Sequence, residues 1–137
     1  MVGKMTRINL DLECAKIGEN IISEAKKNNL KIKELETLIQ KSLGIIEEDG
    51  IYAFYVYLKS KDAFRENSQG NIILKNIWKL LKNEKLKLVI GEYNEKEVEN
   101  AFQKLCENLK NLIFVKTLIE RALIYARYHA KAIGEQK

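Results

Sequence analysis

Apolar residues recur at intervals of three or four positions along most of this 137-residue chain. That interval places them on one face of an α-helix, so the spacing predicts a largely helical protein. The predicted helices, each with one apolar stripe, cover residues 8–28, 30–43, 71–82, 94–108 and 111–133. Two polar segments that break the pattern, 67–70 and 91–94, precede two of these helices and contain the Ser or Asn residues typical of helix caps.

Three shorter segments do not follow one period. Residues 51–58 are rich in aromatic and β-branched residues, which favours a strand, whereas a helix buried on all sides would have a similar composition. We expect a helix there, because every neighbouring segment is helical and an isolated strand would have nothing to pair with. Residues 86–90 form either a strand or an ordered connector. Gly44 and Gly50 bracket a short piece at 45–49.

The composition indicates one globular domain spanning residues 1–137. Apolar residues make up 46% of the chain, enough for a single core, and charged residues make up 31%, so disorder is not expected. Proline is absent, which excludes polyproline, collagen and proline-rich linker structures. The expected fold is therefore all-α, a single-domain bundle of about six helices, with residues 1–7 disordered or irregular and 134–137 a frayed tail.

No stretch of about 18 uncharged apolar residues is present, and the first nine residues lack the apolar segment of a secretion signal. We therefore expect a cytoplasmic protein that does not contact a membrane.

Residue types that carry most enzyme chemistry are scarce. The chain has one histidine, His129, and two cysteines, Cys14 and Cys106, and it has no phosphate-binding glycine loop, nucleophile elbow or zinc-protease motif. We expect no enzyme activity, no metal and no cofactor, and we expect His129 to be a hydrogen-bonded core residue. Two buried reduced thiols are expected for the cysteines, with a disulfide between them as the alternative.

Most of the excess positive charge lies in the middle third of the chain. Residues 49–91 contain eight basic and four acidic side chains, net +4, out of a total net charge of +5. Lys75, Lys79 and Lys82 fall on one side of a predicted helix, opposite its apolar stripe. Asn71 is expected on that side, one turn earlier. The row spans about 10 Å and suits contact with two adjacent phosphates of a nucleic-acid strand, although most lysine rows are simply solvated helix faces.

Five further cations are candidates for contact with nucleic acid. Three lie on the last predicted helix and two follow the aromatic segment: Arg121, Arg127, Lys131, Lys59 and Lys61. The aromatic side chains of that segment are expected in the core rather than stacked on bases: Tyr52, Phe54, Tyr55 and Tyr57. Trp78 is expected either in the core or at an interface.

Three segments together resemble one known family. The first is LGIIEEDGIYAFYVYLKSK at 43–61, in which an apolar run meets a glycine before an aromatic-rich helix ending in Lys-x-Lys. The second is IILKNIWKLL at 72–81, and the third is TLIERALIYARYHAKA at 117–132. In this order they resemble the small helical subunit of type III-B CRISPR RNA-guided effector complexes, the Cmr complexes.

The resemblance implies a non-catalytic role in antiviral defence. Copies of this subunit stack head to tail beside a filament of larger backbone subunits and help to form the channel in which target RNA pairs with guide RNA. A head-to-tail contact repeats, so each copy needs two different interaction patches. The chain would contact the sugar-phosphate backbone, first through Lys75, Lys79 and Lys82, while base pairing supplies sequence choice.

Two other functions remain open from the sequence. One is the small subunit of a type III-A complex, which is also all-helical. The other is a helical adaptor that binds only protein, in which Trp78 would be an anchor and the lysines would serve solubility.

Overall fold

The computed structural model describes the backbone of residues 2–135 and the side chains of residues 10–134. The described residues contain α-helices and no strand, which confirms the all-α prediction. The helices are six in number within this range: α1 (Val2–Lys27), α2 (Ile32–Asp49), α3 (Ile51–Lys59), α4 (Gln69–Lys82), α5 (Glu95–Cys106) and α6 (Leu109–Glu135).

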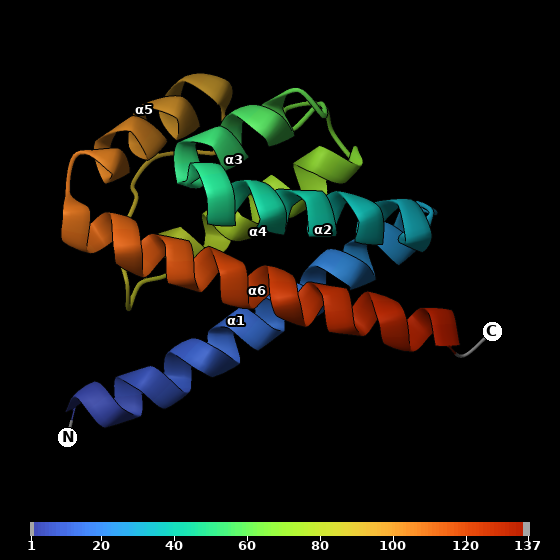
Figure 1. Cartoon of the computed structure of the whole chain (residues 1–137), viewed down its shortest axis with the longest axis horizontal. Helices are drawn as coiled ribbons and strands as arrows, with labels where there is room; N and C mark the ends of the chain where they lie inside the picture. The colour runs from blue at the N-terminus through green and yellow to red at the C-terminus, as the bar shows by residue number, and fades with distance from the viewer. Residues whose placement is uncertain (1, 136–137) are drawn as a thin grey trace.

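The two longest helices cross each other and organise the rest. In Figure 1, α6 runs the length of the molecule with α2, α3 and α5 along one side of it, while α1 crosses α6 at an angle. The first turns of α1 project away from the other helices (Figure 1). α4 packs against α1, α2, α3 and α6 and so lies at the centre of the bundle.

Burial on α4 shows why it is central. Ten of its 14 residues are buried, including Ile73, Ile77 and Leu81 of the predicted apolar stripe. The helix starts at Ser68, whose hydroxyl accepts a hydrogen bond from the backbone N–H of Asn71 at 3.0 Å. This N-cap satisfies one of the donors that a helix start leaves unpaired.

Several predicted boundaries change in the structure. Gly44 lies inside α2 and does not end it, so residues 45–49 are the last turns of that helix. Gly50, with φ of +95°, ends α2 and turns the chain directly into α3. Residues 51–58 are helical, as expected, and residues 86–90 form a connector.

The ends of the chain are more regular than expected. α1 begins at Val2, so residues 2–7 continue the helix and are not irregular, while Met1 lies outside the described residues. α6 continues to Glu135, so helix extends into the segment 134–137 that was expected to fray. Gln136 and Lys137 lie outside the described residues.

Gly18 sets the distance between α1 and α6. A Cβ atom placed on Gly18 would lie 2.6 Å from the backbone nitrogen of Ala126 and 2.7 Å from Cβ of Tyr125. Since real Cβ atoms do not approach other atoms so closely, only glycine allows the two backbones to touch here. This contact places the side chains of α1 that precede Gly18 against the middle of α6.

The aromatic segment of α3 belongs to the core, as predicted. Phe54 and Tyr55 are fully buried, Tyr52 and Tyr57 are half-buried, and the ring of Tyr55 stacks on Phe102 of α5 with centroids 5.3 Å apart. Such a pair stabilises by about 1 kcal/mol beyond simple burial.

Three other predictions concern single side chains. Trp78 is only 3% exposed and belongs to the core. His129 is half-buried and is not part of the buried core, which corrects the expectation of a core histidine. The two thiols are free, so no disulfide joins them; Cys14 is buried, but Cys106 is exposed, which corrects the expectation that both are buried. Cys106 is the last residue of α5 and faces solvent because the buried stripe of that helix runs through Val98, Phe102 and Leu105.

Candidate nucleic-acid interface

The predicted lysine row forms the solvent-facing strip of α4. Lys75, Lys79 and Lys82 are exposed. Apart from Lys75 and Lys79, every residue from Gly70 to Leu81 is buried. The one predicted member that does not belong is Asn71. Its side chain is only 7% exposed, because it points toward the preceding loop. There its amide donates a hydrogen bond to the backbone oxygen of Ala63 at 2.8 Å.

Carboxylates of α1 border this row. The amide of Asn76 donates to Glu24 at 3.2 Å, and that of Asn83 donates to Glu13 at 3.3 Å. Glu24 also lies 3.9 Å from the ammonium group of Lys79, at the outer limit of an ion pair. The row therefore keeps most of its positive charge. The positive electrostatic potential is weaker on the side that faces α1, because the carboxylates of Glu13 and Glu24 lie there.

Lys59 is not a free cation. Its ammonium group lies 2.8 Å from Glu95 and 3.2 Å from Glu99, both on α5. Contacts with Glu95 and then Glu99 raise the pKa of Lys59, and contacts with Lys59 and then Tyr55 lower the pKa of Glu99. Burial, together with the hydrogen bond that its hydroxyl donates to Glu99 at 3.0 Å, raises the pKa of Tyr55. This group joins α3 to α5, so RNA contact at Lys59, as predicted, would compete with two carboxylates that already neutralise its charge.

Arg121 is held in a similar way between α6 and α1. Its guanidinium donates two hydrogen bonds to one oxygen of Asp11, at 3.0 and 2.8 Å, while the hydroxyl of Tyr125 donates to the other oxygen at 2.8 Å. Hydrogen bonds from Tyr125 and then Arg121 lower the pKa of Asp11, and the same contacts raise the pKa of Arg121 and of Tyr125. We call this group, Asp11 with Arg121 and Tyr125, the α1–α6 clasp.

The other two cations of α6 have different surroundings. Arg127 is half-buried, and its Nε is buried with no hydrogen-bond partner among the described residues. Lys131 is exposed and lines a cavity of about 640 Å³ together with Lys31 and Lys33 of the α2 start. The three predicted cations of α6 thus belong to three separate environments and do not form one row.

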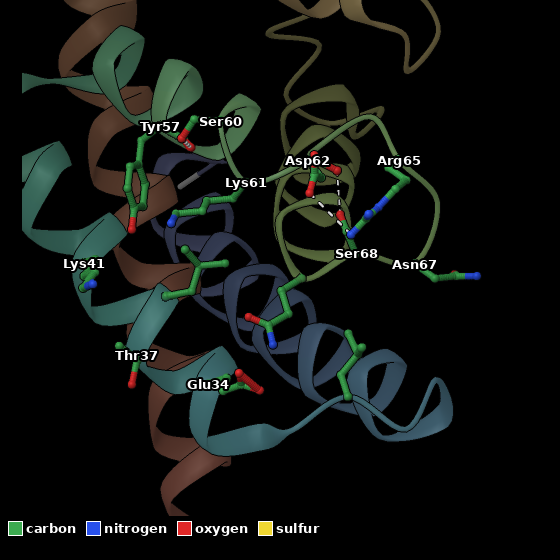
Figure 2. A pocket seen from close by; sticks show the side chains of 13 residues that line it. Glu34, Thr37, Lys41, Tyr57, Ser60, Lys61, Asp62, Arg65, Asn67 and Ser68 are labelled. Carbon is green, nitrogen blue, oxygen red and sulfur yellow. Dashed lines mark hydrogen bonds and ion pairs between the residues drawn. The ribbon is translucent and has the colours of Figure 1, made fainter.

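Lys61 lies in a cleft that is drawn in Figure 2. The cleft has a volume of about 710 Å³ and is enclosed by α2, the end of α3 and the loop that leads into α4. Lys41 and Arg65 line it as well. Sequence spacing had no means of joining Lys41 to Lys61, because Lys41 lies on α2 and Lys61 lies in the turn that follows α3.

A patch of exposed apolar side chains lies at the start of α6. Leu109, Ile113 and Phe114 are 70%, 59% and 37% exposed. Phe114 and Leu10 line a small groove of about 240 Å³ between α6 and α1. Trp78, which was expected as an anchor for a protein partner, is buried and cannot serve as one.

Over the described residues, no three His, Cys, Asp or Glu side chains meet in a way that would hold a metal ion. In the same part of the chain, no helix is both long enough and apolar enough to cross a bilayer. Comparison with protein-family models, with curated proteins and with solved structures finds no match to this chain.

Proposed function

We propose that this protein is a non-catalytic small subunit of a type III-B CRISPR (Cmr) RNA-guided effector complex and contacts the sugar-phosphate backbone of RNA through Lys75, Lys79 and Lys82. The observation that carries the proposal is the outward row on α4, whose members are exposed and, among the described residues, have one distant carboxylate contact. The sequence resemblance supplies the kind of complex. The partners are guide RNA, target RNA, the larger subunits and further copies of this chain, in the cytoplasm.

Weak attraction at one copy suits such a role. Three lysines within about 10 Å neutralise few phosphates, so a single copy holds RNA poorly. Copies aligned along one strand present the row repeatedly, and each later contact becomes intramolecular. The exposed apolar residues at the start of α6, Leu109 and Ile113, are suitable for one of the two patches that a head-to-tail stack requires.

The test is recovery of the tagged chain from its native cells, followed by identification of bound proteins and sequencing of bound RNA. Several larger subunits together with short RNAs that share one constant 5′ end are expected. The triple substitution Lys75→Glu, Lys79→Glu, Lys82→Glu is expected to keep its helicity and to abolish RNA retention.

A second triple variant provides the matched control. Lys96, Lys104 and Lys110 are exposed lysines on α5 and α6, and their replacement by Glu changes the net charge by the same amount. This control is expected to retain RNA. Equal retention by the wild type and the folded α4 variant would remove the row from the RNA surface.

The exposed apolar patch favours a second candidate, an adaptor that binds only protein. Leu109, Ile113 and Phe114 would then be the anchors in place of the buried Trp78. Partner recovery that survives nuclease treatment and depends weakly on salt would favour this adaptor. A type III-A small subunit is the remaining alternative, and the identity of the larger proteins recovered with the chain distinguishes the two complexes.

A further inference from the structure

The cleft in Figure 2 is built from three separate parts of the chain. α2 contributes a wall that carries Glu34, Leu38 and Lys41. Tyr57 comes from the last turn of α3, and the loop between α3 and α4, which contains Lys61, completes the enclosure. Its volume of about 710 Å³ falls within the range of ordinary small-molecule sites, roughly 300–1,000 Å³.

Hydrogen bonds hold the loop side of the cleft in place. The backbone oxygen of Ala63 accepts from Asn71 and from the hydroxyl of Tyr93, both at 2.8 Å, and the hydroxyl of Ser68 donates to the backbone oxygen of Asp62 at 2.6 Å. Gly70 is also required, since a Cβ atom there would clash with the backbone oxygen of Lys61. The loop is thus positioned before any ligand arrives, which reduces the ordering cost of binding.

Two ammonium groups in the cleft are free to bind an anion. Arg65 is paired with Asp62 at 3.4 Å, but Lys41 and Lys61 have no carboxylate within ion-pair distance in the described part of the chain. Figure 2 shows Lys61 reaching from the turn after α3 toward Tyr57, and its ammonium group lies 5.6 Å from the centre of that ring. An anion between Lys41 and Lys61 would therefore lie beside an aromatic surface.

The wall formed by α2 is asymmetric. Lys41 and Glu34 are seven residues apart on this helix, a rise of about 10 Å, and Leu38 lies between them. One end of the cleft is therefore cationic, its middle holds the nearly buried side chain of Leu38, and its far end carries a carboxylate that accepts hydrogen bonds. A simple anion would use only the first of these regions, and a wholly acidic ligand would be repelled by Glu34.

We propose that this cleft binds a nucleoside phosphate. Lys41 and Lys61 hold the phosphate as point charges, the ring of Tyr57 contacts the apolar face of the nucleoside, and Glu34 accepts hydrogen bonds from its hydroxyl or amino groups. The same chemistry belongs to a free nucleotide and to the 5′-phosphorylated end of an RNA strand. The cleft does not include the α4 lysine row. The proposal of nucleotide binding in the cleft and the proposal of RNA contact by the row can therefore fail independently.

The test is a calorimetric titration of the purified chain with each of the four nucleoside 5′-monophosphates, with the matching nucleosides and with inorganic phosphate. Saturable binding of at least one monophosphate is expected, with binding at least tenfold weaker for its nucleoside and for phosphate alone. Lys41→Gln and Lys61→Gln are each expected to weaken binding about tenfold, since each removes one charge from the phosphate. Lys33→Gln, on the same helix but outside the cleft, is expected to stay within twofold.

A short RNA with and without a 5′-phosphate distinguishes the two sources of the ligand. Displacement of the nucleotide only by the phosphorylated strand assigns the site to an RNA end, and failure of both strands to displace it assigns the site to a free nucleotide. Absence of saturable binding by all four monophosphates up to millimolar concentration would overturn the proposal, as would equal losses in the Lys33 and Lys61 variants.

Discussion

Two sets of cations in this molecule have the same chemistry and opposite surroundings. On α4, Lys75 and Lys82 project into solvent with no carboxylate within ion-pair distance in the described chain, and Lys79 has a single one at 3.9 Å. At the contacts of α3 with α5 and of α6 with α1, Lys59 and Arg121 each meet a carboxylate at 2.8 Å. The first set is available to a polyanion, whereas the second already has its counter-charges.

The difference comes from how much of each helix is covered. α4 is surrounded by neighbours and exposes a strip only one residue wide, so carboxylates of other helices reach only its edge. α3 and α6 each lie at the surface beside a partly exposed helix, and carboxylates on that partner reach their cations. Availability for RNA therefore depends on the packing of the helix that carries the cation, more than on the local density of charge.

The largest effect is expected from a substitution that separates α1 from α6. Gly18→Ala places a Cβ atom 2.6 Å from the backbone nitrogen of Ala126, so the helices must move apart and the α1–α6 clasp must open. We expect a loss of about 2 kcal/mol in the free energy of unfolding, measured by urea denaturation.

Gly44→Ala is the matched control for that substitution. Gly44 also lies inside a helix, but nothing stands within 4 Å of the position of its Cβ. A gain of about 0.5–1 kcal/mol is expected from helix propensity alone. Equal effects of the two substitutions would contradict the close contact at Gly18.

Salt dependence compares the two sets of cations directly. In the recovered complex, Lys75→Gln or Lys82→Gln is expected to lower the slope of log affinity for RNA against log salt by about 0.7 each, the value for one phosphate contact on a single strand. Lys59→Gln and Arg121→Gln are expected to leave the slope unchanged, because their charges are already paired. Fluorescence anisotropy with a labelled RNA at several salt concentrations measures all four variants.

Acid should weaken the clasp in a predictable direction. The pKa of Asp11 is lowered in the folded protein by Tyr125 and Arg121, so the unfolded chain takes up the proton first as the pH falls. The stabilisation is complete above the ordinary Asp pKa of about 3.9 and disappears as the pH falls through the folded pKa. Asp11→Asn is expected to lower the urea midpoint at pH 7, and its difference from the wild type should shrink below pH 4.

Glu19→Gln serves as the control for this pH series. Glu19 is an exposed carboxylate on the same helix and has no ion pair in the described chain. Its urea midpoint is expected to follow the wild type at every pH. A constant difference between Asp11→Asn and the wild type across the series would exclude an ionic clasp.

The smallest effect concerns the two thiols. Burial raises the pKa of Cys14 to about 11, so only about one thousandth of it is thiolate at pH 8, and the side chain is covered as well. Iodoacetamide at pH 8 is expected to modify the exposed Cys106 first. Mass spectrometry of the peptides measures the labelling rate of each cysteine. Cys14 lines the groove that also contains Asp11 and Arg121, so Asp11→Asn should raise its labelling rate several-fold and leave that of Cys106 unchanged.

Local patterns were sufficient for most of the fold. The 3.6-residue period located α1, α4, α5 and α6, and the cap residue Asn94 accepts the N–H of Glu97 at 2.9 Å as its position indicated. The glycine at 44 was misleading, because a single glycine weakens a helix by only about 1 kcal/mol and the packing of α2 outweighs this. The exposed row on α4 was also predictable, since its apolar stripe left the lysines on the opposite face.

Surroundings of single side chains depended on contacts that no local pattern contains. Asp11 reaches Arg121 across 110 positions of the chain, and Glu95 reaches Lys59 only because α5 packs on α3. The cleft at Lys41 and Lys61 likewise requires three segments to meet. Helices follow from interactions between residues three or four apart, which the order of residues contains. The pairing of charges and the shape of a cleft follow from how the finished helices pack, and only the folded chain brings those groups together.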